Sequence, residues 1–240
     1  EVQTLLQDTA RDFLSANAPV EALRKLRDSE DALGYTPDLW RQMTEMGWAS
    51  IILPEEYGGL DFGFLGLGVV LEEAGRTLTA SPLFASAGVG ASAVLLGGSE
   101  AQKEALLPTI ATGELTLALA LEDSHHHRPS TNETSAVADG DTYLLNGKKC
   151  FVLDGHSADK LIVVARSSGD IKDTDGISLF LVDREATGVS VQRTSMMDSR
   201  NAANIVFVNV SAPASALLGE HGEAWPILEA RLYRGRIAIA

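Results

Sequence analysis

Cysteine is almost absent from this 240-residue chain, because Cys150 is the only one. A single cysteine excludes an intrachain disulfide and a CxxC metal-binding pair, and this is typical of a protein kept in a reducing cytosol. We therefore expect a cytoplasmic location. Free cysteines are usually buried as small apolar residues, and we expect the same of Cys150 rather than a role as a nucleophile.

Long apolar runs and an excess of basic residues are also missing. No apolar stretch reaches the roughly 18 residues expected of a membrane-spanning helix, so no membrane span is expected. Lysine and arginine number 19 against 33 aspartates and glutamates, which gives a net charge of −14. This balance argues against a nucleic-acid partner, because such proteins need basic side chains to neutralise phosphates.

Two common nucleotide-binding motifs are missing too. No GxGxxG follows a predicted strand and no GxxxxGK[ST] occurs, so neither a Rossmann fold nor a P-loop NTPase is expected. Apolar residues make up 45% and charged residues 22% of the chain, which is ordinary for a globular protein.

The first 115 residues carry the pattern of helices. Apolar residues recur at helical spacing from Val2 to Leu14. Ser99 and Gln102 have the spacing of a capping box, which starts a helix. The predicted helices cover roughly residues 2–14, 37–46, 65–78 and 84–96, and a fifth runs from residue 100 to a stop near Pro108–Gly113.

From Thr116 onward the pattern changes to short β-compatible runs. Turn signals such as Asn146-Gly147 and Asp154-Gly155 separate them. Because no helices intervene, the runs favour an antiparallel barrel or sandwich over βαβ units. The predicted strands cover residues 116–121, 142–146, 149–153, 161–165, 177–182, 189–192 and 205–210.

The predicted fold class is therefore α+β. An all-α helical domain is expected over residues 1–115, and an antiparallel β-barrel or sandwich over 116–216. The last segment, 217–240, contains the start of a further helix from Ala224, which ends without a Gly or Pro stop signal. We interpret it as the first helix of a C-terminal helical bundle.

Four segments resemble the acyl-CoA dehydrogenase family of flavoproteins. Pro54–Gly59 is similar to the family's turn between early helices. Residues 145–152, with Ala158-Asp159, resemble a β-domain segment that normally contains Asn-Gly-x-Lys-x-Trp-Ile-Thr-Asn and then Ala-Asp. Residues 204–210 and 217–222 are similar to the strand and the passage that lead into the last domain. The resemblance covers nearly the whole chain.

This resemblance implies FAD as cofactor and α,β-dehydrogenation of an acyl-CoA thioester to the enoyl-CoA. Electrons would pass to an electron-transferring flavoprotein, and a homo- or hetero-oligomer, a dimer or tetramer, is expected. In the family a carboxylate from the C-terminal bundle removes the α-proton while the β-hydride passes to the flavin. We therefore assign no catalytic base in this chain, expect it beyond Ala240, and expect residues 1–240 alone to be inactive.

By position, the resemblance implies a flavin-binding wall on two strands. Phe151 stands where the family has Trp and remains aromatic. Leu121 and Leu153 replace threonines whose hydroxyls the family uses, so only backbone amides are left to donate there. The candidate cofactor-binding residues are Ala118, Ala120, Leu121, Phe151, Val152 and Leu153.

The loop after this wall departs from the family. Members tend to read Thr-Glu-Pro-x-x-Gly-Ser-Asp, and this chain reads LEDSHHHRP. Imidazoles and a guanidinium can donate hydrogen bonds to a phosphate or a carbonyl, so His126, His127 and Arg128 are candidate substrate-binding residues. No metal site is expected, because adjacent histidines point in different directions on a strand and no further ligand is nearby.

Two alternatives keep the same fold. Some relatives work as mixed complexes in which one subunit has a degraded site, and Leu121, Leu153 and the histidine-rich loop suit such a non-catalytic partner subunit. Related flavin monooxygenases use reduced flavin and oxygen instead, and their hydroxylated product would separate them from a dehydrogenase.

Overall fold

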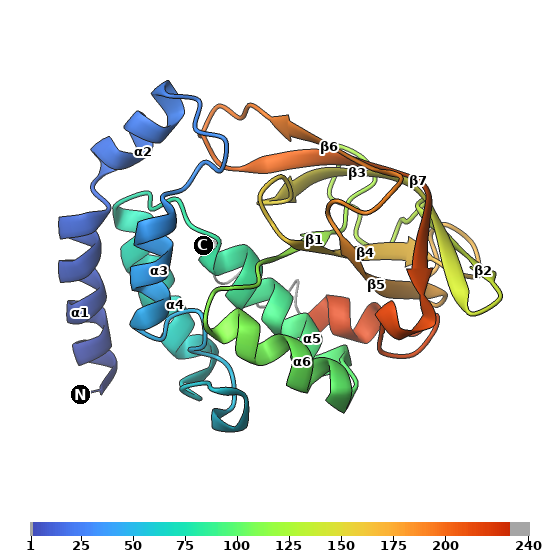
Figure 1. Cartoon of the computed structure of the whole chain (residues 1–240), viewed down its shortest axis with the longest axis horizontal. Helices are drawn as coiled ribbons and strands as arrows, with labels where there is room; N and C mark the ends of the chain where they lie inside the picture. The colour runs from blue at the N-terminus through green and yellow to red at the C-terminus, as the bar shows by residue number, and fades with distance from the viewer. Residues whose placement is uncertain (1, 231–240) are drawn as a thin grey trace.

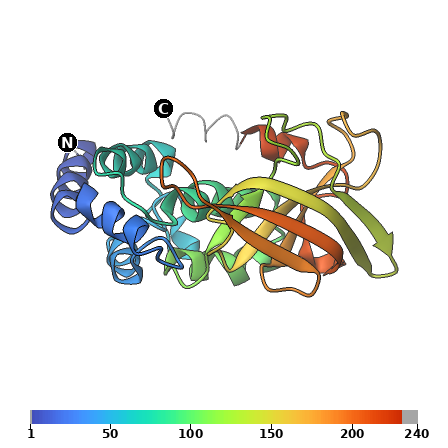
Figure 2. The same cartoon turned by 90° about the horizontal axis from the view of Figure 1, so that it is seen from above.

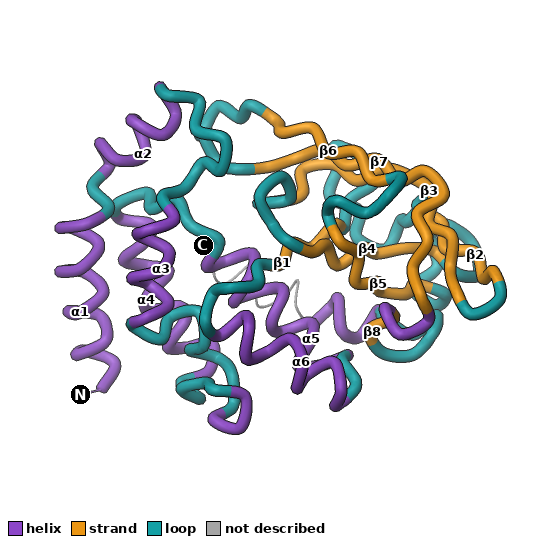
Figure 3. The backbone as a smooth tube through the Cα atoms, viewed as in Figure 1, coloured by secondary structure: helices purple, strands orange, loops and turns teal. Residues whose placement is uncertain are grey.

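The α+β fold class is confirmed by the computed structural model, which describes residues 2–230. Helices lie beside a curled β-sheet, and η2, α5 and α6 run along it (Figures 1 and 3). The helices are α1 (Val2–Asn17), α2 (Val20–Asp28), α3 (Pro37–Glu45), α4 (Gly63–Arg76), the π-helical η2 (Leu83–Gly90), α5 (Ala91–Gly97) and α6 (Glu100–Ala111), with short 3-10 turns η1 (Glu55–Tyr57) and η3 (Ala214–Ala216). Within residues 2–230, no helix combines the length and the apolar character needed to cross a bilayer.

Helix α6 shows how local sequence sets the helix ends. The capping box is confirmed: the Gln102 N–H donates to Ser99 Oγ at 3.3 Å, and the Ser99 N–H donates to Gln102 Oε1 at 2.9 Å. The predicted stop near Pro108–Gly113 is confirmed, since α6 ends at Ala111, and Pro108 lies inside its last turn. Proline removes a single N–H from the helix, and the carbonyl left without it belongs to exposed Glu104, where water can reach it.

The helix predicted over 84–96 is not one continuous α-helix. Its first part is the π-helical η2, and α5 begins only at Ala91. Close packing accounts for the small residues here, since a Cβ on Gly90 would lie 2.5 Å from Leu117 Cβ in β1. The helix predicted from Ala224 is present over residues 225–230, and the rest of that prediction lies outside the described residues.

The strands form one eight-stranded sheet in the order β6-β7-β3-β2-β4-β5-β8, with β1 paired to β4. Most neighbours are antiparallel, as predicted, whereas β1 runs parallel to β4 and β2 touches β4 through one parallel pair. Seen from above, the strands extend away from α1 and α2, which lie at the opposite end of the molecule (Figure 2). The strands are β1 (Leu117–Ala120), β2 (Ser135–Asp139), β3 (Thr142–Leu153), β4 (Lys160–Arg166), β5 (Ile177–Asp183), β6 (Val189–Thr194), β7 (Ala202–Pro213) and β8 (Leu217–Leu218).

Strand β3 corrects the predicted turn at Asn146-Gly147. The strand runs unbroken through both residues, with register shifts against β7 between Leu145 and Gly147 and again between Lys149 and Val152. The glycine serves close approach rather than a turn, because a Cβ on Gly147 would lie 2.5 Å from the Thr134 hydroxyl oxygen.

Two apolar cores meet at strand β4. Leu161, Val163 and Ala165 face the β core, which is enclosed by the sheet and includes Phe180 and Phe207. Ile162 and Val164 face the helical core, which includes Leu14, Met43 and Trp48. Strand β4 is thus buried on both faces, which explains its continuous apolar sequence.

A buried carboxylate joins α1 to α4. Glu73 is only 1% exposed. Its carboxylate accepts hydrogen bonds from Arg11 Nη2 at 2.9 Å and from Gln7 Nε2 at 3.0 Å, and Arg76 lies 3.3 Å away. The hydrogen bond from Arg11 is the main reason that the pKa of Glu73 lies below its ordinary value.

Replacing Glu73 with glutamine should reduce the free energy of unfolding at pH 7 by about 1 to 3 kcal/mol, because charge-assisted hydrogen bonds are lost. A carboxylate with a lowered pKa stabilises the fold above the pKa of the unfolded chain, near 4.3, and this contribution disappears as pH falls through the folded value. Urea unfolding should therefore show a larger difference between the variant and the wild type at pH 7 than at pH 3. The neighbouring Glu72→Gln, on an exposed side chain, should change little, and an equal loss from both variants would contradict this reasoning.

Candidate functional site

A bulge in β3 presents Phe151 beside the end of β1. The pairing with β7 passes from Lys149–Ile205 to Val152–Ala203, which leaves Cys150 and Phe151 outside the ladder. Phe151 has a φ of 52° and is 41% exposed. A non-glycine residue in this backbone region is held there by its surroundings, and such positions often mark functional sites.

The bulge is fastened to the chain that leaves β1. The Cys150 N–H donates to the Glu122 carbonyl at 2.7 Å, and the Cys150 thiol lies 3.8 Å from the Asp123 carbonyl oxygen. The Phe151 N–H faces Asn204 Oδ1 at 3.4 Å. Cys150 is buried, as predicted. The two strands named by the sequence analysis therefore meet at the bulge.

The histidine-rich loop folds back over the same place. The His125 ring meets the Phe151 ring edge to face, with centroids 5.2 Å apart. Glu122 closes the loop: its Oε1 lies 2.7 Å from His127 Nδ1, and its Oε2 accepts the Arg128 N–H at 3.0 Å. Of the predicted substrate-binding residues, His127 is thus engaged by a carboxylate, and all three are exposed.

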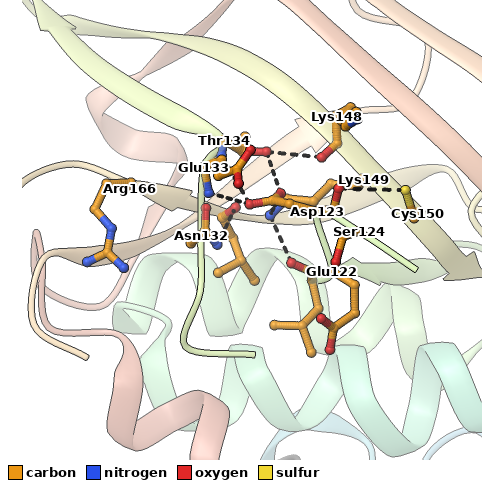
Figure 4. Close-up of polar contacts among 12 residues, drawn as sticks. Glu122, Asp123, Ser124, Asn132, Glu133, Thr134, Lys148, Lys149, Cys150 and Arg166 are labelled. Atoms are coloured by element: carbon orange, nitrogen blue, oxygen red, sulfur yellow. Dashed lines mark hydrogen bonds and ion pairs between the residues drawn. The ribbon is translucent and has the colours of Figure 1, made fainter. Parts of the chain in front are cut away.

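Beneath this loop lies a buried ion pair (Figure 4). Lys149 is fully buried, and its Nζ lies 2.7 Å from Asp123 Oδ1 and donates to the Leu121 carbonyl at 2.9 Å. Burial lowers the pKa of Lys149 to about 8, although the attraction of Asp123 opposes this shift. The ammonium group therefore remains mostly charged at neutral pH.

Asp123 is held by three further donors. The Thr134 hydroxyl donates to Oδ1 at 2.7 Å, the Thr134 N–H donates to Oδ2 at 3.2 Å, and the Glu133 N–H donates to the same oxygen. A buried carboxylate with this many donors and a cationic partner is fully satisfied. The pair fixes the chain between Leu121 and Asp123.

A second buried cation organises the loops around the site. Arg166 is 8% exposed and donates to backbone carbonyls, among them Asp175 at 2.6 Å, Asp173 at 2.8 Å and Ser130 at 3.3 Å. It therefore ties the loop before β2 to the loop between β4 and β5. Burial lowers the pKa of its guanidinium from the ordinary value.

The predicted wall residues differ in what they can offer a ligand. Ala118, Ala120 and Val152 are buried in the β core, so only their backbone can face a ligand. Leu121 and Leu153 are half-buried and Phe151 is exposed. Sequence reasoning gave no role to Asp123, Lys149 or Arg166, although Lys149 occupies the lysine position of the quoted β-domain motif.

Among residues 2–230, no three or more His, Cys, Asp or Glu side chains lie close enough together to hold a metal ion.

Comparison with known sequences identifies the fold. Residues 1–114 match the profile described as acyl-CoA dehydrogenase, N-terminal domain, and residues 120–210 match that of the middle domain. The chain belongs to the acyl-CoA dehydrogenase family. The resemblance inferred from the sequence is confirmed.

Individual family members are similar over the whole chain. Cyclohex-1-ene-1-carbonyl-CoA dehydrogenase of Geobacter metallireducens is 33% identical over 100% of this chain, which spans 63% of that relative. Caffeyl-CoA reductase-Etf complex subunit CarC of Acetobacterium woodii is 28% identical, with coverage of 100% and 64%. The structure of butyryl-CoA dehydrogenase from Megasphaera elsdenii superposes with a TM-score of 0.87 at 26% identity, covering 100% of this chain and 64% of that one. The chain thus spans less than two thirds of the length of each of these three relatives.

Proposed function

We propose that this chain is part of an FAD-dependent acyl-CoA dehydrogenase that converts an acyl-CoA thioester to the enoyl-CoA. The observation that carries the proposal is the bulge at Phe151. It exposes an aromatic ring beside the chain that leaves β1, and a planar ring system can stack on such a surface. Family membership supplies the reaction class.

The residues at the bulge fit a flavin in their chemistry. Phe151 offers an aromatic face, Leu121 and Leu153 offer apolar contact, and backbone amides replace the hydroxyls that leucine lacks. Ala118, Ala120 and Val152 would contribute through their backbone, since their side chains are buried. When bound, FAD supplies the hydride acceptor that dehydrogenation requires.

The loop over the bulge suits an anionic substrate. His126 and Arg128 are exposed next to the proposed flavin wall, and a guanidinium binds phosphate groups well. We propose that these residues, with His127 in its contact to Glu122, receive the phosphate-bearing or carbonyl part of the acyl-CoA. The catalytic base is proposed to lie beyond Ala240.

We further propose that an electron-transferring flavoprotein reoxidises the enzyme, that the whole protein forms a homo- or hetero-oligomer, such as a homotetramer, and that it is cytoplasmic. The relative from A. woodii is named as a subunit of a complex with Etf, which supports the first of these proposals. The single cysteine supports the last.

The test uses the full-length protein. Purified protein should carry the visible absorption of oxidised flavin, and adding acyl-CoA thioesters of different chain lengths should bleach it and yield enoyl-CoA with at least one of them. A hydroxylated product would indicate a monooxygenase instead. Colourless protein that cannot be reconstituted with FAD would contradict the proposed function.

A non-catalytic partner subunit is the second candidate. It is favoured by Leu121 and Leu153, which remove two hydroxyls from the proposed flavin site. Such a chain should co-purify with a related subunit, and turnover should appear only after the two are mixed. Full activity of the isolated full-length protein would exclude this candidate.

A further inference from the structure

Leu121 and Leu153 have no hydroxyl groups, so a ligand at this site depends on backbone N–H groups for its hydrogen bonds. The peptide between Leu121 and Glu122 leaves the end of β1 beside the bulge. Among residues 2–230, no hydrogen bond joins the Glu122 N–H to an acceptor. This amide is therefore available to a ligand.

The buried ammonium of Lys149 fixes the direction of that amide. Lys149 Nζ donates to the Leu121 carbonyl at 2.9 Å. The described residues contain no cis peptide bond, so the carbonyl of Leu121 and the N–H of Glu122 point in opposite directions. The free N–H thus points away from the protein interior that holds Lys149.

The same contact strengthens the amide as a donor. A positive charge on a peptide oxygen polarises the whole peptide unit, and this makes its N–H more positive. Asp123 accepts the other hydrogen bond of Lys149 at 2.7 Å and is itself held by Thr134. The ammonium is therefore held in place on both sides, with no water needed.

We propose that Lys149 is a positioning residue for the cofactor: its buried ammonium orients and polarises the Leu121–Glu122 peptide so that the Glu122 N–H donates a strong hydrogen bond to the edge of the flavin ring. The inference rests on the proposed function, since it requires that the chain holds FAD. In this proposal, a backbone N–H held by a buried charge takes the place of the side-chain hydroxyls as hydrogen-bond donor to the flavin.

A buried ion pair of this kind seldom adds stability by itself. Two apolar residues of similar volume often give an equally stable protein, whereas removal of one partner leaves an unpaired buried charge. Stability and cofactor binding can therefore be separated. A double variant, Asp123→Asn with Lys149→Met, removes both charges. The asparagine oxygen still accepts from the Glu133 and Thr134 N–H groups, and its NH2 group can donate to the Thr134 hydroxyl, which can itself donate to the Lys148 carbonyl.

The experiment compares the full-length wild type with Lys149→Met, the double variant and Lys148→Met. Lys148 is the neighbouring lysine on β3 and its side chain is exposed, so it serves as the matched control. The measurements are the dissociation constant of FAD from flavin fluorescence, the two-electron reduction potential and urea unfolding of the apoprotein.

We expect the double variant to fold stably, because no unpaired charge is left buried, but to bind FAD roughly tenfold to a hundredfold more weakly, the range for loss of a hydrogen bond with charge assistance. Its reduction potential should also fall, because reduced flavin carries more electron density at the bonded edge. If the protein binds reduced flavin more tightly than oxidised flavin, a tenfold change in the ratio of these two affinities shifts the potential of a two-electron couple by about 30 mV. Lys148→Met should match the wild type in all three measurements.

The outcomes separate the two claims. If the wild type binds FAD and the stably folded double variant binds it with the same affinity and potential, the role of Lys149 is wrong and the proposed function stands. If the wild type cannot bind FAD, both are wrong. If Lys149→Met fails to fold, the double variant still decides the question.

Discussion

Replacing Asp154 with asparagine is expected to raise the free energy of unfolding at pH 8 by about 2 to 4 kcal/mol. Burial raises the pKa of Asp154 to about 7, and the opposing effects of Arg200 and the Asn201 hydrogen bond are smaller. Ionising this carboxyl group in the folded protein is therefore unfavourable. Asparagine has nearly the same shape and carries no charge, and it is the residue at this position in the quoted family motif.

The pH dependence follows from the raised pKa. Between about pH 4 and pH 7 the folded protein keeps a proton that the unfolded chain has lost, so the stability of the wild type should fall as pH rises through this window. The variant should lack this decline. Urea unfolding at pH 5 and pH 8 tests it, with the exposed Asp139→Asn as control, and parallel curves for wild type and Asp154→Asn would refute the argument.

Asp154 lies where the sheet meets the helical part of the chain. Its N–H donates to the Asn201 carbonyl, and the Asn201 amide donates to the Gly34 carbonyl at 3.0 Å. Nearby, His156 Nε2 lies 3.1 Å from the Leu33 carbonyl. The helical part and the sheet are therefore joined next to this titrating group.

Replacing Arg166 with methionine is expected to reduce the free energy of unfolding by at least about 3 kcal/mol. Methionine cannot donate, so buried carbonyls of two loops lose a charged partner, and each such hydrogen bond contributes about 1.5 kcal/mol or more. Asn132 also depends on this arrangement, since its N–H donates to the Ile171 carbonyl at 2.8 Å.

Amide hydrogen exchange should locate the effect of that variant. Protection should fall in residues 128–133 and 167–176, which Arg166 joins, more than in α1 or α4. Arg41→Met is a suitable control, because Arg41 forms its ion pairs with Asp38 and Glu45 on an exposed helix surface, where such pairs contribute little. Equal destabilisation by both variants would mean that the hydrogen bonds from Arg166 to the loops stabilise the fold no more than an exposed ion pair does.

The sequence predicted those elements whose signal is local. Periodic apolar residues identified α1, and Ser99 with Gln102 identified the start of α6. Helix α2 was missed because it is short and mostly charged, and none of its side chains is buried. Strand β2 was missed because its sequence, Ser135–Asp139, is rich in alanine, a poor strand former, and only Ala136 is buried.

Features that depend on distant contacts could not be predicted. Asn146-Gly147 has the sequence of a hairpin turn, yet Thr134 passes so close that glycine is needed within the strand. The ion pair of Asp123 with Lys149 joins the segment after β1 to β3, two parts of the chain that only the fold brings together. Family resemblance identified the wall around Phe151 without revealing the buried cations that shape it.

Strand β4 has a consequence for how this protein can be divided. Ile162 and Val164, together with Leu179 of β5, belong to the apolar core that the helices build. A sheet expressed without the helices would expose this apolar surface to solvent and aggregate. Helices expressed without the sheet would lose the apolar surface on which they pack. Heating should accordingly melt both regions in a single calorimetric transition, so recombinant dissection at the junction is a poor route to an autonomous piece.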